Sequence, residues 1–177
     1  MGKHEAVGQM LGYLYQVRFA LYLLLKYENE DSQISIEKFD DVAFVEAGRP
    51  LELLQLKHHI SKSGDLSDTS NDFWRTINVW LDKTLSDKSI LENTKFIILT
   101  TARAGEESAS SFLRDDNKRN IEKAFKILQN VAQTSKNIKH ESYYTKFLMM
   151  DESDKKKLLK KNYIIDDSPN IIQVEDN

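Results

Sequence analysis

Cysteine is absent from this chain of 177 residues, and histidine (4), glycine (6) and proline (2) are scarce. Without cysteine there is neither a disulfide scaffold nor a zinc site built on thiolates, and the absence fits a reducing compartment. Few glycines and prolines exclude collagen-like and low-complexity classes and favour helices. No apolar run approaches the ~20 residues that span a bilayer, and no secretory signal pattern is visible. We therefore expect a cytoplasmic protein that does not enter a membrane.

The composition that remains is that of an ordinary globular protein. Hydrophobic residues make up 40% and aromatic residues 10% of the chain. This is enough to bury a core, so we expect residues 1–177 to form a single domain. The net charge of −3 is not typical of a nucleic-acid-binding protein. It does not exclude an enzyme acting on nucleic acid, because such binding depends on a local patch of charge.

Hydrophobic periodicity predicts helices and strands mixed along the chain. A first helix is expected at 4–27, followed by strands at 34–39, 42–45 and 51–57 with turns at 40–41 and 47–50. The other expected elements are helices at 72–85 (capped by Thr69 or Asn71), 106–113, 117–134, 140–149 and 153–161, and strands at 96–100 and 163–165. A hairpin first and a crossover helix later predict an α/β or α+β fold. Its small mixed sheet is expected to be flanked by helices, with a helix-rich C-terminal half.

Polar residues interrupt the apolar strand expected at 51–57. Alternate residues of a strand share a face, so Gln55, Lys57 and His59 point the same way. The hairpin can also place Asp41, at the start of one strand, beside Gln55 and Lys57 at the end of its partner. A carboxylate, a side-chain carbonyl and an ammonium group would then meet at one edge of the sheet.

Such a trio suits magnesium chemistry on a phosphate ester. Mg²⁺ is usually held by one or two carboxylates together with waters and substrate phosphate oxygens. A lysine beside the ion can orient or deprotonate the attacking water and stabilise charge on the phosphate oxygens. The alternative is purely structural: Asp40 and Asp41 would form a charged turn and Lys57 a solvated strand end. The spacing alone leaves both interpretations open.

Five segments of the chain stand out in order: Gly-Tyr-Leu-Tyr-Gln at 12–16, Glu-x-x-Asp-Asp-Val at 37–42, Leu-Gln-Leu-Lys-His at 54–58, Asp-Phe-Trp-Arg-Thr at 72–76 with Trp80, and Leu-Thr-Thr-Ala at 99–102 continuing into 108–114. Together they resemble the PD-(D/E)xK nuclease superfamily. More narrowly, they resemble the N-terminal DNA endonuclease domain of bacterial antiphage effectors associated with CD-NTase signalling. The likeness spans nearly the whole chain and implies a restriction-endonuclease-like sheet.

The resemblance also implies roles for individual residues. It makes Asp41 and Gln55 the metal-site residues for Mg²⁺, Lys57 the catalytic lysine, and Gln16 a polar residue that faces the site from the first helix. The second motif residue here is Gln, whose amide oxygen is a poorer Mg²⁺ ligand than a carboxylate. Either Asp40 or Asp41 could be the ligand. We choose Asp41, because it adjoins the strand at Val42.

The resemblance implies an Mg²⁺-dependent endonuclease that cleaves double-stranded DNA as an antiphage effector. It also implies that this chain is the N-terminal part of a larger protein, with a regulatory or sensing module outside it. We expect a homo-oligomer when active, because one such metal site cuts one strand. One alternative is an inactive nuclease fold that binds nucleic acid or a partner protein. Another is an interaction domain whose helical second half docks a partner.

The other candidates have ordinary structural interpretations. His58 and His59 are adjacent in a strand, face opposite sides and cannot chelate one ion together. Lysines at 155–157, 160 and 161 indicate a solvated helix face or else a phosphate-contacting surface, and the same two readings apply to Arg114, Lys118, Arg119 and Lys123. Trp74 and Trp80 lie on different faces of one helix. We expect at least one of them to be in the core and keep base stacking open for the other.

Overall fold

The computed structural model describes residues 3–26, 33–57 and 66–168, with side chains from residue 10 to 25 in the first of these ranges. The expected mixture of helices and strands is confirmed. The elements in chain order are α1 (Lys3–Lys26), β1 (Gln33–Ile36), β2 (Val42–Glu46), β3 (Arg49–Lys57), α2 (Asn71–Ser86), α3 (Ile90–Asn93), β4 (Lys95–Thr100), α4 (Ile121–Thr134), α5 (Glu141–Met149), α6 (Glu152–Lys161) and β5 (Asn162–Ile165), with 3₁₀ turns at Ser111–Leu113 and Ile138–His140.

The five strands form one mixed sheet in the order β1-β2-β3-β4-β5. The first three are antiparallel neighbours, whereas β3, β4 and β5 run parallel to one another. Lys57, the last residue of β3, pairs with Thr100, the last residue of β4. The carboxyl ends of the parallel strands therefore meet at one edge of the sheet, which is where ligands usually bind in sheets of this kind.

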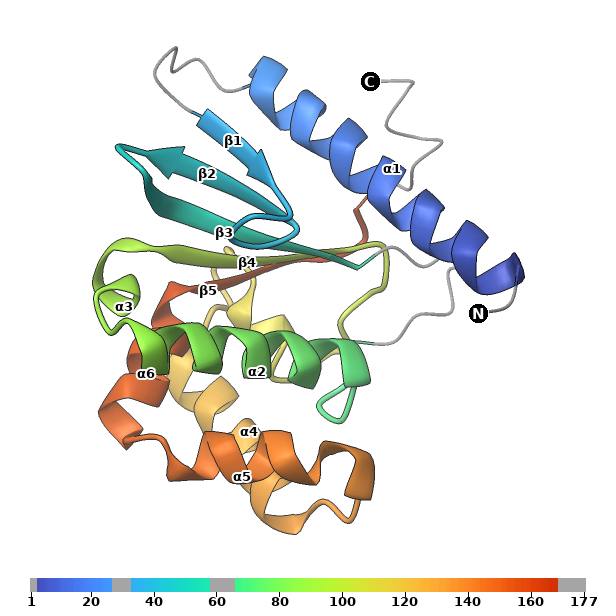
Figure 1. Cartoon of the computed structure of the whole chain (residues 1–177). Coiled ribbons are helices and arrows are strands. Elements are labelled where there is room, and N and C mark those ends of the chain that lie inside the picture. The colour runs from blue at the N-terminus through green and yellow to red at the C-terminus, as the bar shows by residue number, and fades with distance from the viewer. Residues whose placement is uncertain (1–2, 27–32, 58–65, 169–177) are drawn as a thin grey trace.

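Helices cover both faces of the sheet, unequally (Figure 1). α1 lies alone on one face, where Tyr15 and Phe19 pack against Val42, Leu54 and other strand residues. α2 to α6 lie on the opposite side and share a larger core with that face of the sheet. None of the helices in the described ranges, α1 included, is long and apolar enough to cross a membrane.

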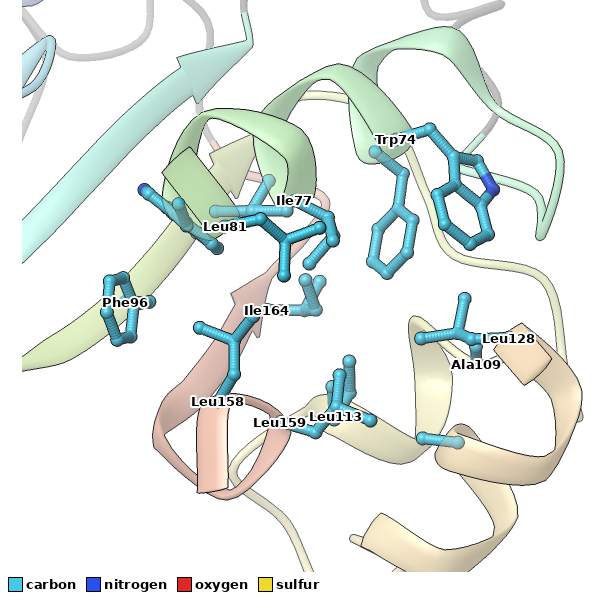
Figure 2. Packing of buried hydrophobic residues seen from close by; sticks show 14 of the residues in the cluster. Trp74, Ile77, Leu81, Phe96, Ala109, Leu113, Leu128, Leu158, Leu159 and Ile164 are labelled. Carbon is cyan, nitrogen blue, oxygen red and sulfur yellow. The ribbon is translucent and has the colours of Figure 1, made fainter. Parts of the chain in front are cut away.

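The larger core is built on α2, whose buried residues recur every three or four positions (Figure 2). Such spacing places them on one face of a helix. Trp74 and Trp80 are both fully buried, so the structure places both tryptophans in the core and gives neither a surface for stacking bases. The ring of Trp74 meets those of Tyr144 and Phe147 edge-on, with centroids 4.7 and 5.5 Å apart.

Backbone geometry shifts the expected strand boundaries. β1 ends at Ile36 and not at residue 39, because Glu37 has a φ of 59° that leaves the extended region. The turn between β2 and β3 consists of Ala47 and Gly48, with φ values of 49° and 78°. Two successive positive φ values characterise the tight hairpin turn. The expected turn at 47–50 is therefore too long, and β3 already includes Arg49 and Pro50.

Three expectations about helices are wrong. The cap of α2 is Ser70, which lies between the two expected candidates and accepts a hydrogen bond from the Phe73 amide. Residues 106–113 form only a short 3₁₀ turn, and α4 begins at Ile121, well after 117. The amide of Ala109 donates to the Asp68 carboxylate at 2.7 Å, a tertiary bond that competes with helical pairing. The short helix α3 was not expected.

Candidate active site

The four residues singled out by the sequence meet at the carboxyl end of β3. Leu54 and Leu56 belong to the core beneath α1. Gln55 and Lys57 alternate with them along the strand and share the other face of the sheet, as expected. Asp41 immediately precedes β2, whose first residue, Val42, pairs with Leu54. The hairpin register therefore brings Asp41 opposite Gln55.

Hydrogen bonds link the three side chains in a row. The Asp41 carboxylate accepts from the backbone amide of Leu56 at 2.8 Å and from Gln55 Nε2 at 3.3 Å. The Lys57 ammonium donates to Gln55 Oε1 at 3.0 Å. The amide of Gln55 thus bridges a carboxylate on one side and an ammonium group on the other. The structure brings these residues together, and their catalytic and metal-binding roles stay a prediction.

Gln16 approaches this cluster from the opposite face. It lies on α1, and its side chain forms a hydrogen bond with Asp41, which opposes in small part the rise that burial causes in the pKa of that carboxyl group. Its carbonyl oxygen, Oε1, is buried and has no hydrogen-bond partner among the described residues. A buried, unpaired polar atom carries a cost in stability, so its presence in a folded protein calls for an explanation.

Asp40 and Asp41 are neighbours with different surroundings. Asp40 is only 7% exposed, and its carboxylate accepts from Trp80 Nε1 at 2.8 Å and from Gln55 Nε2. Nearby, the Lys83 ammonium donates to the Phe39 carbonyl, tying the loop before β2 to α2. The sequence analysis missed this role of Asp40. Its indole partner is 40 residues away in the chain, and no local pattern signals such a contact.

Burial dominates the electrostatics of both carboxyl groups. It raises the pKa of Asp40 to about 6, although hydrogen bonds from Trp80 and Gln55 and the charge of Lys83 oppose the shift. Burial also raises the pKa of Asp41, against the Leu56 amide and the charge of Lys57. Two adjacent buried carboxyl groups therefore lie where an additional positive charge would be favourable.

The donor set fits a magnesium ion that is shared with a substrate. Asp41 supplies one carboxylate, Gln55 Oε1 is a second hard oxygen, and the unpaired Oε1 of Gln16 is a third. Mg²⁺ commonly takes one or two carboxylates from the protein and completes its shell with water and phosphate oxygens. Because two of these three oxygens belong to amides, tight binding of the ion without substrate is not expected.

Two arginines of the C-terminal half are engaged within the fold. Arg119 donates to the carbonyls of Lys160 and Asn162 at 3.0 and 2.7 Å, and its guanidinium lies 4.2 Å from the centre of the Tyr163 ring. Arg114 forms an ion pair with Asp166. Both arginines therefore hold β5 and its flanks in place, and their structural interpretation is the one that the contacts favour.

Three lysines of the helix α6 form contacts within the protein. Lys155 is buried and donates to the Leu148 carbonyl at 3.1 Å, so the expectation of a solvated face is wrong for this residue. Lys156 is paired with Glu122 and Glu152, and Lys157 with Glu92. His58, His59 and the segment from 169 onward lie outside the described residues, so the interpretations placed on them stay untested.

Comparison with models of protein families, with curated proteins and with solved structures finds no match for this chain. What the protein does must therefore be argued from the site itself.

Proposed function

We propose that this protein is a metal-dependent endonuclease whose active site lies at the carboxyl end of β3. The observation that carries the proposal is the convergence of Asp41, Gln55 and Lys57, reached by Gln16 from α1. These residues are the ones that the resemblance to PD-(D/E)xK nucleases selects. A helix, an Asp, a hairpin and a strand ending in Gln-x-Lys follow one another in the chain, which supports a restriction-endonuclease-like fold.

Each side chain has a distinct task in hydrolysis of a phosphodiester. Asp41, Gln55 and Gln16 would hold Mg²⁺, which when bound supplies a Lewis acid for the phosphate oxygens. Lys57 donates to oxygens near it, so it can orient the attacking water and stabilise negative charge that develops on the phosphate. Its ammonium is already directed across the site, because it donates to Gln55 Oε1.

The substrate and biological setting proposed here come from the same resemblance. We take double-stranded DNA as the substrate, in the cytoplasm, with antiphage defence as the purpose. A regulatory or sensing module outside this chain would bring two copies together. One such site cuts one strand, so a double-strand break needs two sites or two encounters. Cleavage should then rise more steeply than in proportion to protein concentration.

A second candidate is an inactive nuclease fold that binds nucleic acid or a partner protein. The observation in its favour is the scarcity of acidic ligands. Among the residues that the structure describes, no group of three or more His, Cys, Asp or Glu side chains could hold a metal ion. An amide at position 55 and a second Asp turned toward Trp80 leave a weakly charged site.

Incubation of supercoiled plasmid with the protein tests the two candidates against each other. An active enzyme converts the plasmid to nicked and linear forms with Mg²⁺ or Mn²⁺ and stops when the metal is chelated. Lys57→Ala should abolish this conversion. The matched control is Lys95→Ala, because Lys95 is an exposed lysine at the start of β4, at the opposite end of the parallel strands. If the wild type does not cut under any of these conditions, the second candidate, an inactive fold that binds nucleic acid or a partner protein, is favoured.

A further inference from the structure

We propose that Asp40 is a positioning residue that fixes which way the amide of Gln55 points. The inference rests on the proposed function in one respect, namely that the carbonyl oxygen of Gln55 serves the site. Asp40 itself does not face that site. Its carboxylate is buried between β3 and α2 and held by the indole of Trp80.

The amide of Gln55 has two ends with opposite hydrogen-bonding properties. Its NH₂ group can only donate and its carbonyl oxygen can only accept. The NH₂ end lies against the carboxylates of Asp40 and Asp41, and the carbonyl end lies 3.0 Å from the Lys57 ammonium. Each contact therefore pairs a donor with an acceptor.

The reversed orientation fails on both sides. Turning the amide over would place Oε1 against two carboxylates and the NH₂ group against an ammonium. The buried Asp40 would lose a donor, and the site would present N–H groups where a cation needs an oxygen. With Asp40 ionised, one orientation is therefore strongly preferred, and it is the one in which Gln55 Oε1 faces Lys57.

Trp80 fixes the orientation of Asp40 in turn. An indole N–H is a donor only, so the group that faces it at position 40 must be an acceptor. An aspartate satisfies this with one oxygen, and its other oxygen accepts from Gln55 and from the Asp41 backbone amide. An asparagine has a single oxygen. If that oxygen serves Trp80, its NH₂ group faces Gln55 and drives the amide into the reversed orientation.

The same reasoning explains why an amide can stand at position 55. Replacing Gln55 by Glu alone would gather three carboxylates at positions 40, 41 and 55 and remove a donor from Asp40. Exchanging both residues restores the match at position 40: in Asp40→Asn/Gln55→Glu, the Asn oxygen accepts from Trp80 and its NH₂ group donates to the new carboxylate. The carboxylates of Asp41 and residue 55 then face each other, as two ligands of one divalent cation do. The double exchange conserves charge and nearly conserves volume, and it moves the carboxylate toward the site.

The test is a double-mutant cycle with two readouts, the thermal unfolding midpoint without and with millimolar Mn²⁺, and plasmid cleavage. Partners that orient metal ligands typically contribute 10–100-fold to affinity or activity, so Asp40→Asn should lower both the Mn²⁺ affinity and the cleavage rate about tenfold or more. Gln55→Glu should lower the midpoint by about 10 °C, because it leaves buried carboxylates unpaired. The double variant should regain the Mn²⁺ response and cleavage, and its midpoint should exceed that of Gln55→Glu, most clearly with Mn²⁺ present.

Asp82→Asn is the matched control, because Asp82 is an exposed aspartate of α2 paired with Lys146. It should change neither readout. Recovery of the midpoint in the double variant supports the inference even if Gln55→Glu alone does not fold. Three results would overturn it. The first is a wild type whose unfolding midpoint does not respond to Mn²⁺, and the second is an Asp40→Asn variant that responds as the wild type does. The third is a double variant whose losses equal the sum of those of the single variants. Absence of cleavage alongside an intact Mn²⁺ cycle would overturn the proposed function and leave the positioning role standing.

Discussion

The two faces of the sheet differ in what they contribute. Among the described residues, the face toward α2 to α6 shares a core of 25 buried apolar residues, whereas the face beneath α1 has 9. The candidate site lies between them: Asp40 is anchored to the larger core through Trp80, and Asp41 is reached from α1 by Gln16. Buried apolar area is the main source of stability. The larger core should therefore decide whether the protein folds, and α1 should mainly complete the site.

Removing one aromatic ring from each face should give the largest losses in the free energy of unfolding. Truncating a buried aromatic residue to Ala typically costs 3–5 kcal/mol. Trp80→Ala should reach about 5 kcal/mol, because it also removes a donor from the buried Asp40. Phe19→Ala, on α1, should cost about 3 kcal/mol. Urea unfolding measures both, and a larger loss for Phe19→Ala would show that the α1 face carries more of the stability than its core suggests.

The pH dependence of stability should reveal the burial of Asp40. Burial raises the pKa of Asp40 from 3.8 to about 6, with Lys83 and Asp41 as the charged neighbours. A carboxyl group with a raised pKa in the folded state stabilises the protein at low pH, and this contribution is lost as pH rises from about 4 to about 6. The loss amounts to about 3 kcal/mol for a shift of this size.

Asp40→Asn removes this titration. The free energy of unfolding of wild type and of Asp40→Asn is measured by urea unfolding at pH 4 and pH 7. Between these two values of pH, the wild type should lose about 3 kcal/mol relative to Asp40→Asn. A difference that stays constant over this range would mean that Asp40 is accessible to solvent and titrates normally.

Much of this arrangement could be predicted from the sequence because it is local. Strand alternation places Gln55 and Lys57 on one face, and a hairpin between adjacent strands brings Asp41 to them. The parts that were missed depend on distant or conformational features. The early end of β1 follows from a positive φ at Glu37, and the contact between Asp40 and Trp80 joins residues far apart in the chain.

Gln16→Leu should give the smallest change in stability of these variants. It therefore tests whether α1 contributes to the site more than to stability. The substitution keeps a side chain of similar length and removes a buried oxygen that has no partner within the described part of the chain. The free energy of unfolding should therefore change by less than about 1 kcal/mol. Cleavage should nevertheless fall about tenfold, because the side chain loses its contact with Asp41. The matched control is Val17→Leu at the next position of α1. Equal cleavage by Gln16→Leu and wild type would remove Gln16 from the site.

If DNA is hydrolysed at the carboxyl end of β3, a change at Lys57 should separate cleavage of DNA from its binding. Binding of a labelled duplex is measured by fluorescence anisotropy with Ca²⁺, and single-turnover cleavage of the same duplex is measured with Mg²⁺. Lys57→Ala should cut at least about 100-fold more slowly than wild type. It should bind the duplex within a few-fold of wild type, because binding rests on many phosphate contacts. If Lys57→Ala cleaves the duplex as fast as the wild type and the control variant Lys95→Ala do, DNA is not hydrolysed by this site.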